Sequence, residues 1–114
     1  TNTGLTFAVA FNYGARHELV MAARRLAELA RTGRLEPCDI SEARISAELT
    51  TAGMPDPDLI IRTSGEQRLS NFLMWQAAYA EFVFTPVLWP DFDRAALETC
   101  LTEFGARTRR FGGL

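Results

Sequence analysis

The sequence contains no lysine, so all 12 basic side chains among its 114 residues are arginine. Arginine presents a planar fork of donors that suits phosphate and carboxylate groups, although a compositional bias of the genome is the simpler explanation. The 14 acidic residues bring the formal net charge to −2, so the chain has no overall positive field. This argues against bulk nucleic-acid binding, which needs many phosphate contacts, but not against a local cluster of arginines.

Cysteine, histidine and long apolar runs are also scarce. Cys38 and Cys100 form neither a CxxC pair nor a zinc-ligand spacing, so we expect ordinary buried thiols in an intracellular chain. His17 stands at the start of an expected helix, where a surface position is the simpler alternative to a general base. No apolar run approaches the roughly 20 residues that span a bilayer, and no signal-peptide pattern is present.

What the sequence does contain is an alternation of strand-like and helix-like segments. Strands are expected at residues 5–11, 59–61 and 81–85, and helices at residues 15–31, from Asp39 or Ser41, at residues 71–78, and from Asp91 or Asp93. This order predicts an α/β fold with a mostly parallel sheet flanked by helices. The chain opens on a strand at once, and a sheet of so few strands keeps two open edges, so we expect an incomplete portion of a larger domain.

The burial of two segments can be predicted from their patterns. The apolar triplet at residues 59–61 is expected to be buried on both faces, as strands of parallel sheets are. The helix at residues 15–31 is expected to bury one apolar face, made of Leu19, Ala23, Leu26 and Ala30.

The start of the second helix has two interpretations. With Ser41 as the N-cap, Ile40 and Ile45 form a hydrophobic staple around the first turn. With Asp39 as the N-cap, Glu42 completes a capping box instead. The sequence leaves both open.

The loop that follows residues 59–61 is the candidate binding site. It lies at the carboxyl end of an expected parallel strand, where ligands bind in open α/β sheets, and it carries Arg62, Arg68 and Ser70. Ser70 would also cap the helix at residues 71–78, whose free N–H groups and dipole favour an anion. Two arginines, a hydroxyl and a helix N-terminus would together hold a phosphate or diphosphate.

A plainer interpretation of these residues stands beside this one. Ser70 would then only cap its helix, and Arg62 and Arg68 would form surface ion pairs of little energetic worth, with Asp58 and Glu66 respectively.

Glu81 has two interpretations of its own, because a carboxylate between an apolar helix and an apolar strand needs a partner. It forms a salt bridge, which is the simpler interpretation, or it ligates a metal.

Several segments, taken together and in order, resemble the cis-prenyltransferase family, and bacterial undecaprenyl diphosphate synthase in particular. The longest is DLIIRTSGEQRLSNF at residues 58–72, followed by WQAAYAE at residues 75–81 and WPDF at residues 89–92. The resemblance extends to NTGL at residues 2–5, NYGAR at residues 12–16 and RRFGG at residues 109–113. It therefore covers essentially the whole chain.

The family condenses isopentenyl diphosphate onto an allylic diphosphate, repeatedly and with cis geometry. The resemblance implies that Arg62, Arg68 and Ser70 hold the isopentenyl diphosphate, together with the backbone of Leu69. It also implies that Glu81 helps to hold Mg²⁺, which prefers carboxylate and diphosphate oxygens.

The resemblance also implies an assembly and a location. Family members are homodimers whose Arg-x-Gly tail, here Arg110 and Gly112 around a phenylalanine, reaches toward the partner's active site. Farnesyl diphosphate is the expected allylic substrate, and undecaprenyl diphosphate, the precursor of the peptidoglycan lipid carrier, is the expected product. We expect a cytoplasmic protein with peripheral membrane contact, because the product is a membrane lipid, and no nucleic-acid partner.

The sequence departs from the family in three places. Gln67 stands where many bacterial members have histidine, which would alter a hydrogen bond near the diphosphate, and Ala15 replaces a second glycine, which should change only a turn. The family's Asp-Gly-Asn-Gly-Arg motif, which holds the allylic diphosphate and supplies a metal-binding aspartate, does not occur. We therefore expect residues 1–114 to be the C-terminal part of a single cis-prenyltransferase domain, inactive alone. The alternatives are a non-catalytic partner subunit of such an enzyme and an unrelated phosphate-binding module.

Overall fold

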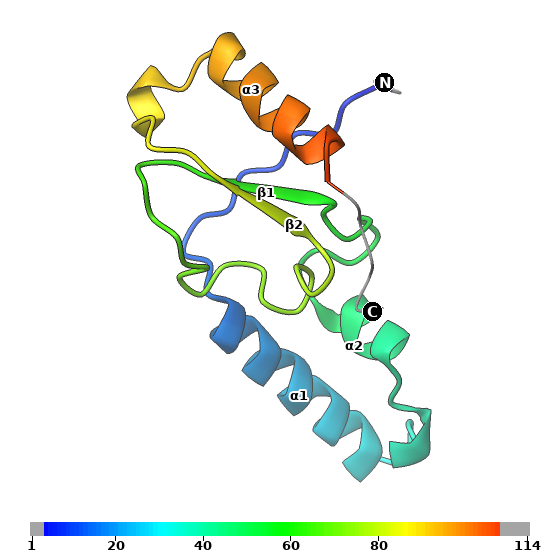
Figure 1. The fold of residues 1–114 in the computed structure, drawn as a ribbon. Helices are drawn as coiled ribbons and strands as arrows, with labels where there is room; N and C mark the ends of the chain where they lie inside the picture. The colour runs from blue at the N-terminus through cyan, green and yellow to red at the C-terminus, as the bar shows by residue number, and fades with distance from the viewer. Residues whose placement is uncertain (1–3, 108–114) are drawn as a thin grey trace.

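The computed structural model describes residues 4–107, which form an α/β arrangement around a pair of strands. The elements are α1 (Ala15–Arg31), α2 (Glu42–Glu48), β1 (Leu59–Arg62), β2 (Glu81–Phe84) and α3 (Arg94–Gly105), with short 3-10 turns at Pro37–Asp39 and Trp89–Asp91. Figure 1 shows the strands crossing the middle of the molecule, with α3 above them and α1 and α2 below. The α/β class is confirmed.

β1 and β2 form a two-stranded parallel sheet, as predicted. Leu59 lies opposite Glu81 and Arg62 lies opposite Phe84, so the two strands are in register from end to end. Val83 of β2 is buried, but every residue of β1 is only half-buried. The expectation that β1 is covered on both faces is therefore wrong for the described residues, because this sheet has no third strand and few helices to cover it.

Helix α1 has the bounds that its sequence predicts, because it contains no glycine or proline and Gly33 follows it with a φ of +76°. Its buried face is displaced by one residue from the predicted one. Ala23 is exposed, and the buried positions are Ala15, Glu18, Ala22 and Leu26. A carboxylate thus lies on the inner face of the helix, which the apolar pattern did not suggest.

The helix caps settle the alternatives that the sequence left open. Ser41 caps α2, since its Oγ accepts a hydrogen bond from the N–H of Arg44 at 3.1 Å, whereas Asp39 lies in the preceding 3-10 turn. Asp93 caps α3 in the same way, with its Oδ1 accepting from the N–H of Ala96 at 2.9 Å.

The strand expected at residues 5–11 is absent from the structure. Leu5, Phe7 and Phe11 are 90%, 84% and 83% exposed, and the segment runs as irregular chain. A strand needs the backbone of a neighbouring strand for its hydrogen bonds, and the sheet among residues 4–107 contains β1 and β2 alone. The composition was correct for a strand, but its partner is not supplied by this part of the chain.

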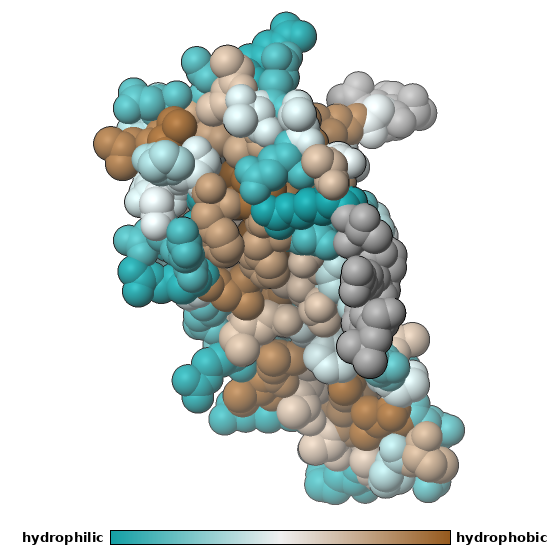
Figure 2. Space-filling view, viewed as in Figure 1, coloured by the Kyte–Doolittle hydropathy of each residue, from teal (hydrophilic) through white to brown (hydrophobic). Residues whose placement is uncertain are grey.

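Apolar side chains remain accessible elsewhere too. Figure 2 shows brown, apolar surface running through the middle of one face of the molecule. Cys100 is buried, as expected for a structural thiol, but Cys38 is exposed, contrary to the expectation. No helix within residues 4–107 combines the length and the apolar character that a bilayer crossing requires.

Candidate functional site

The loop after β1 is fastened to the segment that follows β2. The N–H of Ser64 donates to the carbonyl of Val87 at 2.8 Å, and the N–H of Gly65 donates to the carbonyl of Thr85 at 2.9 Å. Ser64 and Gly65 have φ values of +65° and +71°, so the turn passes through the left-handed region at both residues. The loop therefore leaves the carboxyl end of β1 in a fixed direction, immediately after Arg62.

Arg68 projects from this loop and pairs with Glu66. Its Nε donates to Oε2 of Glu66 at 2.9 Å and its Nη2 contacts the same oxygen, while 68% of the Arg68 side chain stays exposed. The hydrogen bond and charge of Arg68, and more weakly the charge of Arg62, hold the pKa of the Glu66 carboxyl below its usual value. The Arg68–Glu66 pair predicted from the sequence is confirmed.

The helix expected after Ser70 is absent, which changes the predicted cradle. Residues 70–79 form a succession of turns, and Ser70, Asn71 and Leu73 have φ values of +51°, +63° and +46°. Consecutive left-handed residues cannot begin a right-handed helix, so Ser70 caps nothing. The loop offers two arginines, the exposed hydroxyl of Ser70 and the half-buried Leu69, without a helix N-terminus behind them.

Glu81 begins β2 and forms a salt bridge, the simpler of its two interpretations. Arg107, just after α3, donates from Nη1 to Oε2 of Glu81 at 3.4 Å and to the carbonyl of Phe82. The Nη2 of Arg107 donates to Glu103 at 2.7 Å. The Glu81 carboxylate is 26% exposed, so it lies at the surface of the sheet within reach of solvent.

The Glu81 carboxylate fits Mg²⁺ only where water and substrate phosphates supply the other ligands. Among residues 4–107, no group of three or more histidine, cysteine, aspartate or glutamate side chains could hold a metal ion. Mg²⁺ is commonly held by one or two carboxylates, with water and substrate phosphates completing its octahedron. A single accessible carboxylate such as Glu81 suits that arrangement.

A buried polar cluster beside the loop was missed from the sequence. Glu18, which is 7% exposed, accepts at Oε1 from the N–H and the hydroxyl of Thr50, at 2.8 and 2.7 Å. Its Oε2 accepts from Gln76 at 3.2 Å and from the hydroxyl of Tyr13. The signal that could have revealed it is the spacing of Glu18 from Ala22 and Leu26, which places a carboxylate on the apolar stripe of α1.

The protonation states of this cluster follow from its hydrogen bonds. Burial alone would raise the pKa of Glu18, but the hydrogen bonds from Tyr13, Thr50 and Gln76 outweigh it and hold the pKa below its usual value. Burial first, and then the neighbouring Glu18, raise the pKa of Tyr13 to about 12. At neutral pH Glu18 is therefore an ionised acceptor and Tyr13 a neutral donor.

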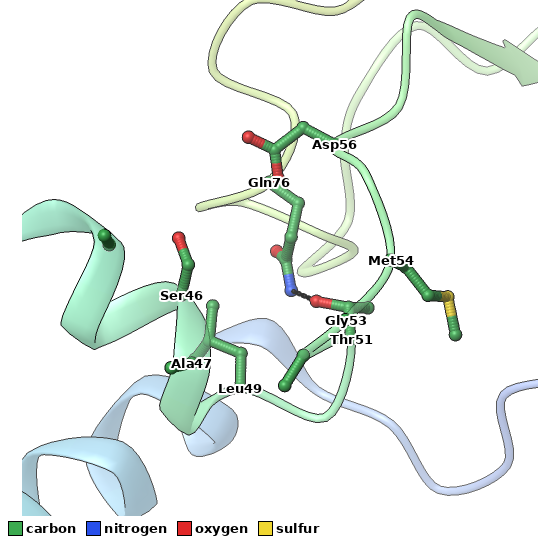
Figure 3. A pocket seen from close by; sticks show the side chains of 10 residues that line it. Ser46, Ala47, Leu49, Thr51, Gly53, Met54, Asp56 and Gln76 are labelled. Carbon is green, nitrogen blue, oxygen red and sulfur yellow. Dashed lines mark hydrogen bonds between the residues drawn. The ribbon is translucent and has the colours of Figure 1, made fainter.

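Gln76 and Trp75 attach the turns after the loop to α2 and its C-terminal end. Trp75 Nε1 donates to Ser46 Oγ at 3.0 Å, and Gln76 Nε2 donates to Thr51 Oγ1 at 3.0 Å. Figure 3 shows Gln76 reaching between Ser46 and Thr51 at the edge of a cavity of about 270 Å³. These contacts place residues 75–76 against the body of the molecule while Arg68 stays exposed.

The remaining sequence-predicted positions have mixed outcomes. His17 is exposed, as its simpler interpretation required, and Gln67 is exposed on the loop. Ala15 is buried as the first residue of α1, so it occupies an ordinary helical position. Arg110 and Gly112 lie outside the described residues.

The chain matches a protein family along most of its length. The model of the family described as putative undecaprenyl diphosphate synthase matches residues 1–112. An isoprenyl transferase from Bradyrhizobium diazoefficiens is 60% identical over 99% of this chain and 45% of its own length. The undecaprenyl-diphosphate synthase of Micrococcus luteus, described as specific for (2E,6E)-farnesyl diphosphate, is 51% identical over the same shares. The chain spans less than half the length of these relatives.

The fold is similar to that of a solved enzyme of related description. The crystal structure of lavandulyl diphosphate synthase from Lavandula x intermedia, in complex with dimethylallyl diphosphate, superposes with a TM-score of 0.84 and 48% sequence identity. The match covers 88% of this chain and 43% of that one. Both the sequence and the fold thus match one portion of longer proteins.

Proposed function

The chain belongs to the undecaprenyl diphosphate synthase family, and from that premise we propose that it is the part of a cis-prenyltransferase that binds isopentenyl diphosphate. The enzyme would condense this substrate onto an allylic diphosphate with cis geometry. The observation that carries the proposal is the position of Arg62 at the carboxyl end of β1, with the exposed Arg68 in the loop that follows it.

Arg68 binds the diphosphate by exchanging one anion for another. Its exposed pair with Glu66 contributes little stability, so replacing that carboxylate with a diphosphate costs little. The guanidinium fork matches two phosphate oxygens at once, and Arg62 adds a second fixed cation. The Ser70 hydroxyl and the Leu69 N–H contribute neutral donors from the same loop.

Glu81 would hold Mg²⁺ together with diphosphate oxygens. When bound, the ion neutralises negative charge on the diphosphates as the allylic bond breaks. Arg107 pairs with the Glu81 carboxylate and compensates its charge when no metal is present. The chain's own residues thus bind and orient the diphosphate.

The proposal extends to the assembly and location of the whole protein. We propose a cytoplasmic homodimer in which Arg110 and Gly112 reach the partner's site. Farnesyl diphosphate would be the allylic substrate and undecaprenyl diphosphate, used for peptidoglycan synthesis, the product. The product's apolar tail would bring the enzyme into peripheral contact with the membrane.

Arg68→Ala tests the proposal, with isopentenyl diphosphate binding measured by titration calorimetry. Loss of two charge-assisted hydrogen bonds should cost about 2 kcal/mol, which corresponds to a roughly thirtyfold weaker Kd. Arg94→Ala is the matched control, because Arg94 is an exposed arginine paired with Glu98 at 2.9 Å on α3. It should bind as tightly as wild type. Equal affinities of the wild type and Arg68→Ala would contradict the proposed site.

A non-catalytic partner subunit is the weaker alternative. Such a subunit has no need of Arg62, Arg68, Ser70 and Glu81, and all of these residues are present.

A further inference from the structure

We infer that Asn71 is a positioning residue, which acts through its neighbours Arg68 and Ser70 by tying their loop to the start of α1. The carbonyl of Asn71 accepts from the N–H of Ala15 at 2.9 Å, and its Oδ1 accepts from the N–H of Arg16 at 2.8 Å. This inference rests on the proposed function of the loop. It assigns a role to a residue that touches no phosphate in the proposed site.

The cap of α1 comes from a distant part of the chain. The first N–H groups of a helix have no partner within the helix, and the residue before it usually supplies one through its side chain. That residue here is Gly14, which has no side chain to offer. Asn71, 55 positions from Arg16, takes its place. The hydrogen bonds that cap α1 are therefore the same ones that hold the end of the loop.

The backbone beside Asn71 requires this external support. Ser70 and Asn71 both have left-handed φ values, which asparagine adopts readily but serine adopts seldom unless its surroundings favour them. The two hydrogen bonds from α1 to Asn71 hold this backbone conformation, and the edge of Tyr13 against Phe72, with ring centroids 5.8 Å apart, adds to them. Without them the chain would relax to ordinary backbone conformations, and Ser70 would point elsewhere.

Asn71 also completes a pair of anchors. The bonds from Ser64 and Gly65 to the segment after β2 hold the loop near Arg62, and Asn71 holds its other end. Arg68 lies between the two anchors. Fixing both ends keeps Arg68 near its position relative to Arg62 before the ligand arrives, which lowers the ordering cost of binding.

Gly14 gives an independent way to disturb the contact. A Cβ at Gly14 would lie 2.9 Å from Nδ2 of Asn71, which is too close. The backbone of Gly14, with φ of −142°, accepts alanine without strain. Gly14→Ala should therefore push the Asn71 side chain off Arg16 while leaving Asn71 itself unchanged.

The test measures the Kd for isopentenyl diphosphate by calorimetry, on variants whose folding is first checked by circular dichroism. We expect Asn71→Ala to weaken binding about tenfold and Gly14→Ala to weaken it several-fold. Added to Arg68→Ala, the Asn71→Ala change should weaken binding by less than it does in the wild type, because part of its effect passes through Arg68. A purely structural role would show no such coupling.

Asp93→Ala is the matched control, since it removes the equivalent cap of α3, from the N–H of Ala96. It should lower the melting temperature without changing the Kd. If Arg68→Ala weakens binding but Asn71→Ala does not, the inference about Asn71 fails while the proposed function stands. If Asn71→Ala does not fold, Gly14→Ala decides, and wild-type affinity there has the same meaning. If Arg68→Ala binds like the wild type, the proposed function fails first.

Discussion

Replacing Glu18 by glutamine is expected to lower the free energy of unfolding by about 2–3 kcal/mol at pH 7. The buried Glu18 carboxylate accepts four hydrogen bonds, from Tyr13, Gln76 and two groups of Thr50. A carboxylate is an acceptor at both oxygens, whereas the amide of glutamine would turn donors toward other donors. Urea unfolding should show a lower midpoint at an unchanged slope.

Glu28→Gln is the control for this experiment. Glu28 lies on the same helix but is exposed, and it pairs with Arg31 at 2.9 Å. Since exposed ion pairs contribute little, this variant should unfold almost as the wild type does. Equal losses of unfolding free energy in Glu18→Gln and Glu28→Gln would show that the buried hydrogen bonds of Glu18 do not account for its contribution to stability.

Acid should remove the advantage of Glu18 over glutamine. Burial raises the pKa of Glu18, but its hydrogen bonds outweigh this and the net pKa is lowered, so the unfolded state binds its proton first. The stabilisation is complete above the ordinary glutamate pKa of about 4.3 and is lost as the pH falls through the lowered value. The difference in unfolding free energy between wild type and Glu18→Gln should therefore shrink below about pH 5. A difference that stays constant down to pH 3 would contradict the assignment.

The second large effect concerns catalysis. Given isopentenyl diphosphate, farnesyl diphosphate and Mg²⁺, the 114-residue chain alone is expected to produce no elongated prenyl product. The sequence has no Asp-Gly-Asn-Gly-Arg motif to hold the allylic diphosphate, and it spans 45% of the Bradyrhizobium relative. Incorporation of labelled isopentenyl diphosphate into lipid measures this directly, with the undecaprenyl-diphosphate synthase of Micrococcus luteus as the positive control. Product above the protein-free background would overturn the expectation.

The elements that the sequence predicted well are those whose hydrogen bonds are local or whose pairing is simple. Helix α1 keeps its own backbone bonds, so an uninterrupted amphipathic pattern was enough to place both ends. Residues 5–11 and 71–78 failed because their outcome depends on distant groups. The first lacks a neighbouring strand in this part of the chain, and the second is held in turns by bonds to α1.

In the candidate site, too, the sequence predicted the residues that are near one another in the chain and missed the partners that are far away. Arg62 ends β1, and Arg68 and Ser70 lie in the loop that follows it, so chain order alone brings them near one another. The partner of Glu81 is Arg107, which is 26 residues away and follows another helix, so no local pattern indicates it. The same is true of Asn71, whose contacts with α1 depend on how the loop folds back.

The crossover between β1 and β2 has a consequence for how the sheet and the helices depend on one another. In most parallel strand pairs the crossover contains a helix, which secures itself through its own backbone bonds. Here residues 63–80 form turns and irregular chain instead, and their hydrogen bonds go to α1, to the C-terminal end of α2 and to the segment after β2. Such a crossover is expected to keep its shape only while those elements stay folded. The part of the chain proposed to meet the substrate therefore takes its order from the elements around it.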